Sequence, residues 1–378
     1  MTSIYQKAFY TFYANLLRSR AMRFGGKGRG VLVAKTDHIG DFVIASEAIR
    51  LAFAKVEAEY PHFERAILVR RNVAPIARAE LPTAKVIEMP RLSSVFPLAM
   101  LQVRAAAVSR DLHGQWRKFI SFRHHPTLLE DILFDSLSAT MSYGLVGSEL
   151  DANIWPNQLR KFKYKVSDGY PSQSDCRGVP REIEANRRLL DLVGVKDNAY
   201  LPRLASFSVK KGQTLLICPH ASAAIRCYPL DKLVCALQEC TLPVGWRYGV
   251  CVEPSRRSEG LRLAQALSTA SSNIDVLTPT DTLEFCRLIA STGAIFSMDS
   301  AAAHIACSMS KPGVFLLGGG HYGSFGPWAS IPAQFWLTHH LDCFNCNWHC
   351  TRNEPECITG ITPTEIGRYL TEACKYSA

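Results

Sequence analysis

Residues 294–309, with the sequence AIFSMDSAAAHIACSM, carry the clearest chemical signal in the chain. The apolar run 294–298 predicts a short buried strand of a parallel sheet. Asp299 and Ser300 are helix-capping residue types, and the alanine-rich stretch that follows favours a helix. A strand that leads directly into a capped helix aims free backbone N–H groups and the positive end of the helix dipole at one point, which suits a phosphate group. His304 lies one turn further along and can reach the same ligand.

Small side chains follow the two capping residues. Ala301, Ala302 and Ala303 carry only methyl groups, so a ligand can come close to the backbone. We therefore expect the N–H groups of residues 300–302 to bind phosphate. The alternative interpretation is an ordinary capped helix in which His304 belongs to the core.

A second strand–loop–helix pattern lies nearer the N-terminus. Residues 31–35 (VLVAK) predict a buried strand, TDHIGD predicts a loop, and residues 42–55 predict a helix. The pattern places Gly40 and Asp41 at the start of this helix. A carboxylate there can either cap the helix or act as a general base.

Strands and helices alternate along most of the chain. Apolar runs predict further strands at 66–71, 85–89, 118–125, 139–147, 214–222, 245–252, 274–277 and 314–320, and helical patterns lie at 181–195, 230–240, 258–268, 282–291 and 363–375. Such alternation is typical of parallel βαβ units. Residues 151–180 are rich in Pro, Gly, Ser and Asp and predict a long excursion towards a linker. We expect an α/β fold of two doubly wound domains facing a cleft, with ligands at the carboxyl ends of the strands.

Four regions follow from this organisation. They are a basic aromatic N-terminal segment (1–30), an N-terminal domain (31–195), a C-terminal domain (196–362) and a C-terminal helix (363–378). We expect the last helix to cross back to the first domain.

The composition indicates a globular protein with an anionic partner. The chain has 378 residues, 47% hydrophobic and 20% charged, with a net charge of +10. No apolar run is long enough to span a membrane, and no signal peptide is recognisable, so we expect a cytoplasmic location. The positive charge suits a nucleotide, a phosphorylated glycan or a membrane surface, whereas no nucleic-acid-binding motif accompanies it.

The N-terminal segment mixes aromatic and basic residues. Tyr5, Phe9 and Tyr10 lie close in sequence to Arg18, Arg20 and Arg23. This mixture suits a helix on the anionic inner leaflet of a membrane, which makes peripheral attachment to the inner membrane one expectation. A helix packed on the protein's own surface is the other.

Further motifs occur in register with these two patterns. Ser222 and Arg226 follow a predicted strand in PHASAAIRCYP, and Glu259 opens a predicted helix in EPSRRSEGLRLAQAL. Together with KTDHIGD and DSAAAHIA, these segments resemble glycosyltransferase family 9, the bacterial heptosyltransferases of lipopolysaccharide synthesis. The resemblance extends from about residue 30 to residue 375 and implies the GT-B architecture of two Rossmann-like domains.

The resemblance also implies roles for these residues. Asp41 matches the carboxylate regarded in the family as the catalytic base, and Arg226 matches the cation on the donor diphosphate. Glu259 matches an acidic residue at the donor ribose, and Asp299, Ser300, Ala301, Ala302 and His304 match the phosphate and sugar motif. Ala301 stands where the family usually has Gly, Arg226 replaces Lys and Tyr228 replaces Trp. Arginine still suits a diphosphate because its guanidinium can donate two parallel hydrogen bonds.

The chemistry of glycosyl transfer fits these residues. A nucleotide sugar needs its departing diphosphate neutralised and the acceptor hydroxyl deprotonated, which Arg226 and Asp41 can do. No pair of carboxylates typical of a glycosidase is recognisable. We expect acceptor contacts from basic residues that follow strands of the first domain: Arg70, Arg71, Arg123, His124 and His125. A solvated rim is the alternative interpretation for this basic set.

Four cysteines cluster near the C-terminus. Cys343, Cys346, Cys350 and Cys357 have the spacing C-x2-C-x3-C-x6-C. Four thiols so close together in a cytoplasmic protein favour a structural zinc or iron site. A metal-free reduced loop, or two disulfides formed on purification, is the alternative.

The leading hypothesis is an inverting glycosyltransferase that needs no cofactor for catalysis. It would transfer a heptose or related sugar from an ADP-sugar to a lipopolysaccharide core or another anionic glycan or glycolipid. The alternatives are a heptosyltransferase acting on a protein such as an autotransporter, and a nucleotide-sugar-binding protein without catalysis. A dehydrogenase is disfavoured because no G-x-G-x-x-G follows a strand.

Overall fold

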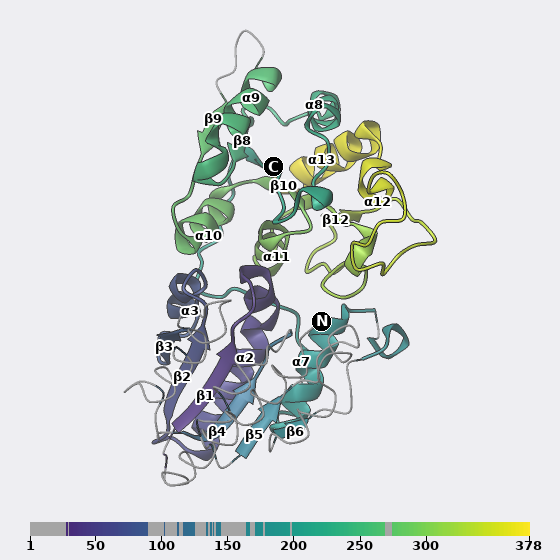
Figure 1. Ribbon diagram of the computed structural model, residues 1–378. Helices are drawn as coiled ribbons and strands as arrows, with labels where there is room; N and C mark the ends of the chain where they lie inside the picture. Colours follow the sequence, from purple (N-terminus) through teal and green to yellow (C-terminus); the bar gives the residue numbers. More distant parts are fainter. Residues whose placement is uncertain are drawn as a thin grey trace. The chain divides into compact units, whose positions relative to one another are not determined.

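The computed structural model describes most of the chain as two compact units, each built on one parallel sheet (Figure 1). The first unit comprises Met1–His38, Ala48–Pro171 and Ala185–Ala199, and the second comprises Ile39–Glu47, Ser172–Glu184 and Tyr200–Ala378. The described residues are 28, 30–89, 102, 112, 116–124, 134, 137, 139, 141–144, 164–166, 171–176, 178–196, 199–268 and 274–378. Most of the predicted N-terminal segment and of the predicted excursion 151–180, and His125, lie outside them.

The first unit contains a sheet of six described strands. In chain order its elements are β1 (Gly30–Lys35), α2 (Ile39–Glu59), β2 (Glu64–Val69), α3 (Ala74–Glu80), β3 (Lys85–Glu88), β4 (Trp116–Ser121), β5 (Met141–Gly144), β6 (Tyr164–Val166) and α7 (Arg181–Leu192). The first turns of α2 and α7 belong to the second unit. Every residue of β1 is buried, as expected for a central strand covered on both faces.

The second unit repeats this plan over the rest of the chain. Its elements are η3 (Gln173–Cys176), β7 (Thr214–Cys218), η4 (Ala224–Arg226), α8 (Leu230–Glu239), β8 (Arg247–Cys251), η5 (Pro254–Arg256), α9 (Arg257–Leu267), β9 (Asp275–Leu277), α10 (Thr282–Ser291), β10 (Ala294–Met298), α11 (Ala301–Ser308), β11 (Gly313–Leu316), η6 (Gly319–His321), β12 (Gln334–Leu337), α12 (Glu356–Thr359) and α13 (Pro363–Ser377). The apolar residues of β7 and β10, including Ile217 and Phe296, form its core with residues from α8 and α13.

Both sheets have the strand order of a dinucleotide-binding fold. The order is β3-β2-β1-β4-β5-β6 in the first sheet and β12-β11-β10-β7-β8-β9 in the second. Each order reverses direction at its centre, between β1 and β4 and between β7 and β10. Ligands of such sheets bind outside the carboxyl ends of the strands at this switch point. In the second unit we therefore expect a ligand at the loops that follow β7 and β10.

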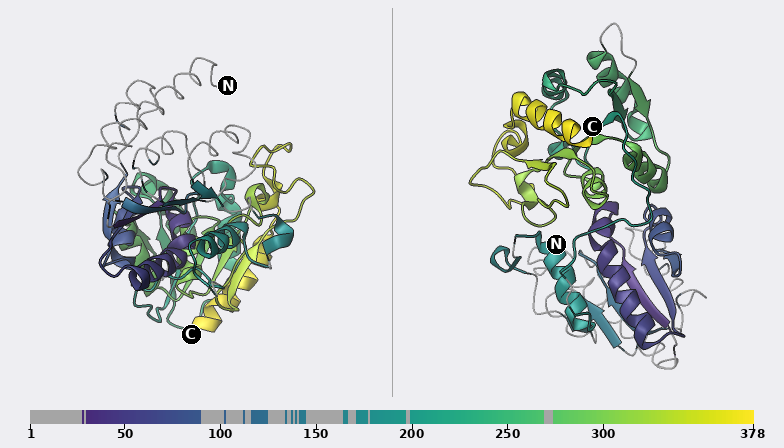
Figure 2. Two further views of the ribbon diagram at one scale, coloured as in Figure 1. Left: turned by 90° about the horizontal axis from the view of Figure 1, so that it is seen from below. Right: turned by 180° about the vertical axis from the view of Figure 1, so that it is seen from behind.

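The last helix packs within the second unit. α13 lies against α8 and against the strands β10 and β11, as the yellow helix in Figures 1 and 2 shows. Ile366, Leu370 and Cys374 on its inner face are fully buried. Its apolar stripe is buried in the core of the second unit, and the expectation that this helix crosses back to the first domain stays a prediction. Among the described helices, none combines the length and apolar character needed to cross a membrane.

Candidate functional site

The loop between β10 and α11 follows the switch point of the second sheet. All five residues of β10 are buried, and Asp299 follows the strand directly. Ser300 caps α11, because its hydroxyl accepts a hydrogen bond from the N–H of Ala302 at 3.3 Å. We expected this N–H to bind phosphate; the structure shows that it is used by the cap. The dipole of α11 still directs its positive end towards the same loop.

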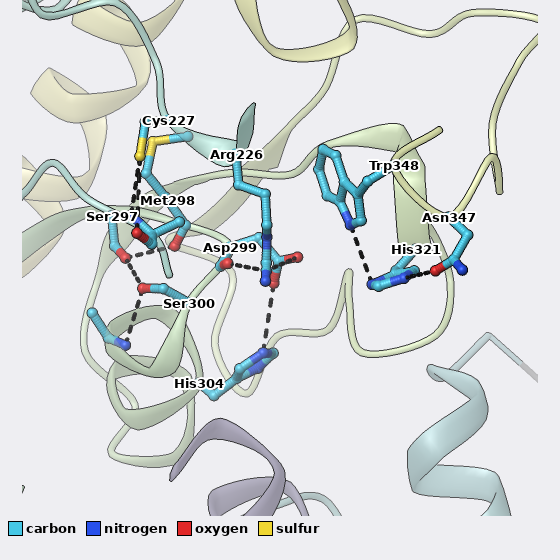
Figure 3. A network of polar contacts seen from close by, with 12 residues as sticks. Arg226, Cys227, Ser297, Met298, Asp299, Ser300, His304, His321, Asn347 and Trp348 are labelled. Atoms are coloured by element: carbon cyan, nitrogen blue, oxygen red, sulfur yellow. Dashed lines mark hydrogen bonds and ion pairs between the residues drawn. The ribbon is translucent and has the colours of Figure 1, made fainter. Parts of the chain in front are cut away.

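Asp299 is contacted by both other functional groups at this point (Figure 3). Arg226 Nη2 donates to the main-chain oxygen of Asp299 and, at 3.1 Å, to its Oδ2. His304 Nε2 lies 3.6 Å from Oδ1 of the same carboxylate. Burial alone would raise the pKa of Asp299, but the contact with His304 and the charge of Arg226 outweigh it and lower this pKa. Arg226 and His304, which the sequence placed in two separate motifs, therefore both contact the ionised carboxylate of Asp299.

The imidazole of His304 is oriented by an indole. Trp328 Nε1 donates to His304 Nδ1 at 3.2 Å. Since Nδ1 accepts this hydrogen bond, the ring proton of the neutral imidazole is on Nε2, the atom that faces Asp299. His304 is buried, with 5% of its surface exposed, yet its second nitrogen is directed at the candidate site rather than into the core.

Arg226 is held at the carboxyl end of β7 by its own neighbours. The N–H of Ala221 donates to Cys227 Sγ at 3.3 Å, which tightens the turn around η4. The hydroxyl of buried Tyr228 donates to the carbonyl of Ile361 at 2.7 Å and anchors the segment after the turn. Among the described residues, no acceptor bonds the buried Nε of Arg226. A buried donor left in this state is one that a ligand oxygen can satisfy.

The remaining donor-site predictions lie on the neighbouring loops. Ser222 is exposed on the loop after β7, and Glu259 lies in the first turn of α9. Glu259 Oε2 lies 3.1 Å from Nε2 of His220, a residue that the sequence reasoning did not single out. Burial lowers the pKa of His220, and Arg256 lowers it further, against the effect of Glu259. The position of His220 in PHAS, directly after a buried strand, was the available signal.

Residues 184–354 match a family model described as glycosyltransferase family 9 (heptosyltransferase). The chain carries a glycosyltransferase family 9 domain. The predicted family resemblance and the predicted enzyme class, a glycosyltransferase, are thereby confirmed. Arg226, Glu259, Asp299 and His304 all lie within the matched residues.

Solved structures share the fold of this chain at low identity. A glycosyltransferase of family 9 from Veillonella parvula matches with a TM-score of 0.69 and 11% identity, over 92% of this chain and 98% of that one. The E. coli heptosyltransferase WaaC with ADP matches with a TM-score of 0.61 and 14% identity, over 92% and 99%. The iron-containing dodecameric glycosyltransferase TibC from enterotoxigenic E. coli matches with a TM-score of 0.52 and 12% identity, over 94% and 78%. The predicted GT-B fold is confirmed. No curated protein gives a significant match.

Asp41 lies outside the residues matched by the family 9 model, in the first turn of α2. Residues Ile39–Glu47 nevertheless belong to the second unit. A methyl group added to Gly40 would lie 3.0 Å from Cδ2 of His304 and 3.9 Å from the backbone nitrogen of Ala301. The absence of a side chain at Gly40 therefore lets the backbone beside Asp41 come close to the start of α11.

The predicted acceptor residues of the first unit do not form one basic surface. Arg123 and His124 are buried, with 3% and 4% of their surfaces exposed. Arg123 Nε donates to Ser121 Oγ at 2.8 Å, and the N–H of His124 donates to Asp37 Oδ2 at 3.0 Å. Both residues are buried and contact neighbours in or beside the loops after β1 and β4. Arg70 and Arg71, which precede α3, are exposed instead.

The exposed members of that set are Arg70 and Arg71. Arg70 Nε donates to the carbonyl of Thr36, in the loop after β1. Two charged residues of KTDHIGD to which the sequence analysis assigned no role lie at the end of β1 and in the loop after it. Lys35 Nζ is 2.9 Å from Asp37 Oδ2 and donates to the carbonyl of Phe122 at 2.8 Å. Burial would raise the pKa of Asp37, but Lys35 outweighs it and lowers this pKa strongly.

Three of the clustered cysteines, Cys343, Cys346 and Cys350, lie on one loop, and Cys357 lies in α12 directly after it. Residues 342–357 are here called the cysteine loop. All four are free thiols, and all four line one pocket, together with Gly319, Gly320 and Trp348. Burial raises the pKa of Cys350, and the three other thiols of the cluster raise it further. Four neighbouring thiols are a donor set for zinc or iron. Within the described residues, however, no three His, Cys, Asp or Glu side chains are grouped as a metal-binding set.

Proposed function

We propose that this chain transfers a heptose or a related sugar from an ADP-sugar to a lipopolysaccharide core or related glycan, with inversion at the transferred carbon. The observation that carries the proposal is the buried Nε of Arg226, which lacks a described partner beside the start of α11. A diphosphate oxygen would satisfy this donor. The family 9 match and the likeness to a heptosyltransferase solved with ADP support the choice of donor.

The donor diphosphate would bind between Arg226 and the first turn of α11. Arg226 is already held by Asp299, so little side-chain entropy is lost when its remaining N–H groups bind phosphate. As the bond from the sugar to the diphosphate breaks, negative charge grows on the leaving oxygen. A fixed guanidinium and a helix dipole stabilise that charge without reorganising. Glu259, oriented by His220, would accept hydrogen bonds from the ribose hydroxyls.

Asp41 would remove the proton from the acceptor hydroxyl. The close approach of Gly40 to His304 supports its presence near the transferred sugar. A base that activates a hydroxyl on the face opposite the leaving diphosphate gives inversion in a single displacement. This reaction balances without a cofactor: the proton passes to the carboxylate, and the departing diphosphate keeps the electron pair of the broken bond.

The acceptor would be an anionic glycan or glycolipid bound by the domain of residues 31–195. Arg70 and Arg71, both exposed, are the acceptor contacts that we retain from the predicted set. The net charge of +10 suits a phosphorylated acceptor and the anionic inner leaflet, where peripheral attachment through residues 1–30 is part of the proposal. A protein acceptor is the alternative, and sugar-transfer assays with a lipopolysaccharide core and with a protein acceptor distinguish the two.

Cys343, Cys346, Cys350 and Cys357 would hold a zinc or iron ion that stabilises the cysteine loop. The thiol chemistry and the shared pocket support this assignment, and the solved structure of TibC is described as iron-containing. When bound, the ion would supply structural stability and no chemistry for sugar transfer.

A thermal-shift comparison of nucleotides tests the proposed donor. We expect ADP to raise the melting temperature of the wild-type chain more than GDP or UDP at the same concentration, because a ligand stabilises the fold by RT ln(1 + [L]/Kd), which is larger for the tighter ligand. The Arg226→Ala variant should lose most of the ADP shift. A larger shift with GDP or UDP, or an unchanged ADP shift in the variant, would contradict the proposed donor site.

A further inference from the structure

The cysteine loop is packed against the glycine loop, Gly318–Gly320, which follows β11. A methyl group added to Gly318 would lie 2.3 Å from the ring of Trp348, and one added to Gly320 would lie 2.5 Å from it. At Gly319 it would lie 2.5 Å from the ring of Phe344. The aromatic rings therefore rest directly on the backbone, which only glycine allows at these positions.

Backbone hydrogen bonds hold the two loops together. The N–H of Asn345 donates to the carbonyl of Gly319 at 2.8 Å, and the N–H of Asn347 donates to that of Gly320 at 3.1 Å. Asn345, Asn347 and Trp348 adopt φ values of 66°, 50° and 62°. A left-handed conformation is costly for a bulky residue such as Trp and persists where the surroundings impose it. The position of the Trp348 indole is therefore held at a cost in backbone conformational energy.

The indole of Trp348 contacts two groups beside Asp299 (Figure 3). Its Nε1 donates to His321 Nδ1 at 3.3 Å, and His321 Nε2 lies 2.6 Å from Asn347 Oδ1. These contacts fix the ring proton of neutral His321 on Nε2. The guanidinium of Arg226 lies 5.5 Å from the centroid of the Trp348 ring, within the range of a cation–π interaction. Arg226 therefore contacts both Asp299 and Trp348.

We infer that Trp348 is a positioning residue for the donor-phosphate site, through which the cysteine loop sets the affinity for the diphosphate. Trp348 adds a second contact to Arg226 besides those with Asp299, and together with Asn347 it fixes the orientation of His321. The inference rests on the proposed function, in which Arg226 binds the donor diphosphate. It assigns the cysteine loop a part in donor recognition, although the loop is more than a hundred residues from Arg226 in sequence.

Calorimetric titration of ADP and of adenosine into the purified full chain tests this role. A cation–π contact contributes roughly 0.5–1 kcal/mol at partly exposed sites, so we expect Trp348→Leu to weaken ADP binding about two- to fivefold. Adenosine lacks the diphosphate, and its affinity should stay within about twofold of the wild-type value. Trp348→Phe keeps an aromatic face and should recover most of the ADP affinity. Gly320→Ala displaces the indole without altering it and should reproduce the loss.

Trp246→Leu is the matched control. Trp246 precedes β8 at the amino end of the same sheet, where its ring covers Gly293. The Trp246→Leu substitution should lower the melting temperature without changing the ratio of ADP affinity to adenosine affinity. Equal losses for ADP and adenosine in Trp348→Leu and Gly320→Ala, or an unchanged ADP affinity in both, would overturn the inference. If Arg226→Ala itself binds ADP normally, the proposed donor site fails instead, which separates the two results.

Discussion

Arg226 donates hydrogen bonds to two oxygens of Asp299, one on the main chain and one on the side chain. This pair joins the loop after β7 to the loop after β10, the two strands at the switch point of the second sheet. Because Asp299 directly precedes the cap of α11, the pair also places a fixed positive charge at the positive end of a helix dipole. That combination is suited to binding a diphosphate.

The first prediction concerns this arginine. Arg226→Ala should weaken ADP binding roughly 10- to 100-fold, because charge-assisted hydrogen bonds are lost, and should change adenosine binding much less. Arg226→Lys should keep more of the ADP affinity than Arg226→Ala, since it keeps the charge but not the two-pronged donor. Calorimetric titration measures both affinities. Equal losses for ADP and adenosine would mean that Arg226 is a structural residue only.

The second prediction concerns the proposed base. Asp41→Asn should lower turnover roughly 100-fold or more while donor affinity stays nearly intact, because the amide keeps the shape and cannot accept a proton. Glu57→Gln, an exposed change near the other end of α2, should leave turnover unchanged. Steady-state rates and ADP titrations on the three proteins decide the matter. Near-normal turnover in Asp41→Asn would remove this residue from the mechanism.

The third prediction concerns the metal. Protein purified under reducing conditions should contain about one zinc or iron ion per chain, and a strong chelator should release the ion and lower the melting temperature. Elemental analysis and differential scanning calorimetry measure the two effects. Replacement of Cys350, the exposed thiol of the four, by Ser should lower the metal content. A metal-free wild-type chain with four free thiols or two disulfides would refute the site.

The fourth prediction concerns stability against pH. Burial lowers the pKa of Lys311 from 10.5 to about 8. Between these values the unfolded chain binds more protons than the folded chain, so the contribution of Lys311 to stability increases as the pH rises through this window. Lys311→Met should therefore flatten the rise of melting temperature with pH relative to the wild type. Parallel curves for the two proteins would show that Lys311 does not titrate in this way.

The order of elements was predictable because each carries a local signal. Residues 294–298 and 282–291 match β10 and α10 at both ends, since an apolar run and a capping Asp281 mark them clearly. Ends that depend on neighbouring strands were predicted less well: the run 118–125 predicts a strand reaching His125, whereas β4 stops at Ser121. Beyond Ser121 the chain turns inward, and Arg123 packs over the ring of Phe134.

The candidate site was predictable where its residues stand next to strand ends and not elsewhere. Asp299 and Arg226 follow buried strands, so their types and positions already indicated a ligand site. Trp348 and His321 follow no such rule. Their role depends on a loop that folds back over three glycines, and no periodicity in the sequence reports that contact. The burial of Arg123 could not be predicted either, because no local pattern in the sequence reports its contact with Phe134.

Release of ADP from ADP-heptose is the measurement that tests the proposed donor and reaction most directly. The wild-type chain, given ADP-heptose and a lipopolysaccharide core that lacks heptose, should release ADP in an acceptor-dependent manner and attach the sugar to the core. Arg226→Ala and Asp41→Asn should both reduce this release strongly. An ADP-heptose donor bound at Arg226 and Asp299 would be contradicted if folded wild-type protein released no ADP from ADP-heptose with any glycan or protein acceptor. It would also be contradicted if both variants released as much ADP as the wild type.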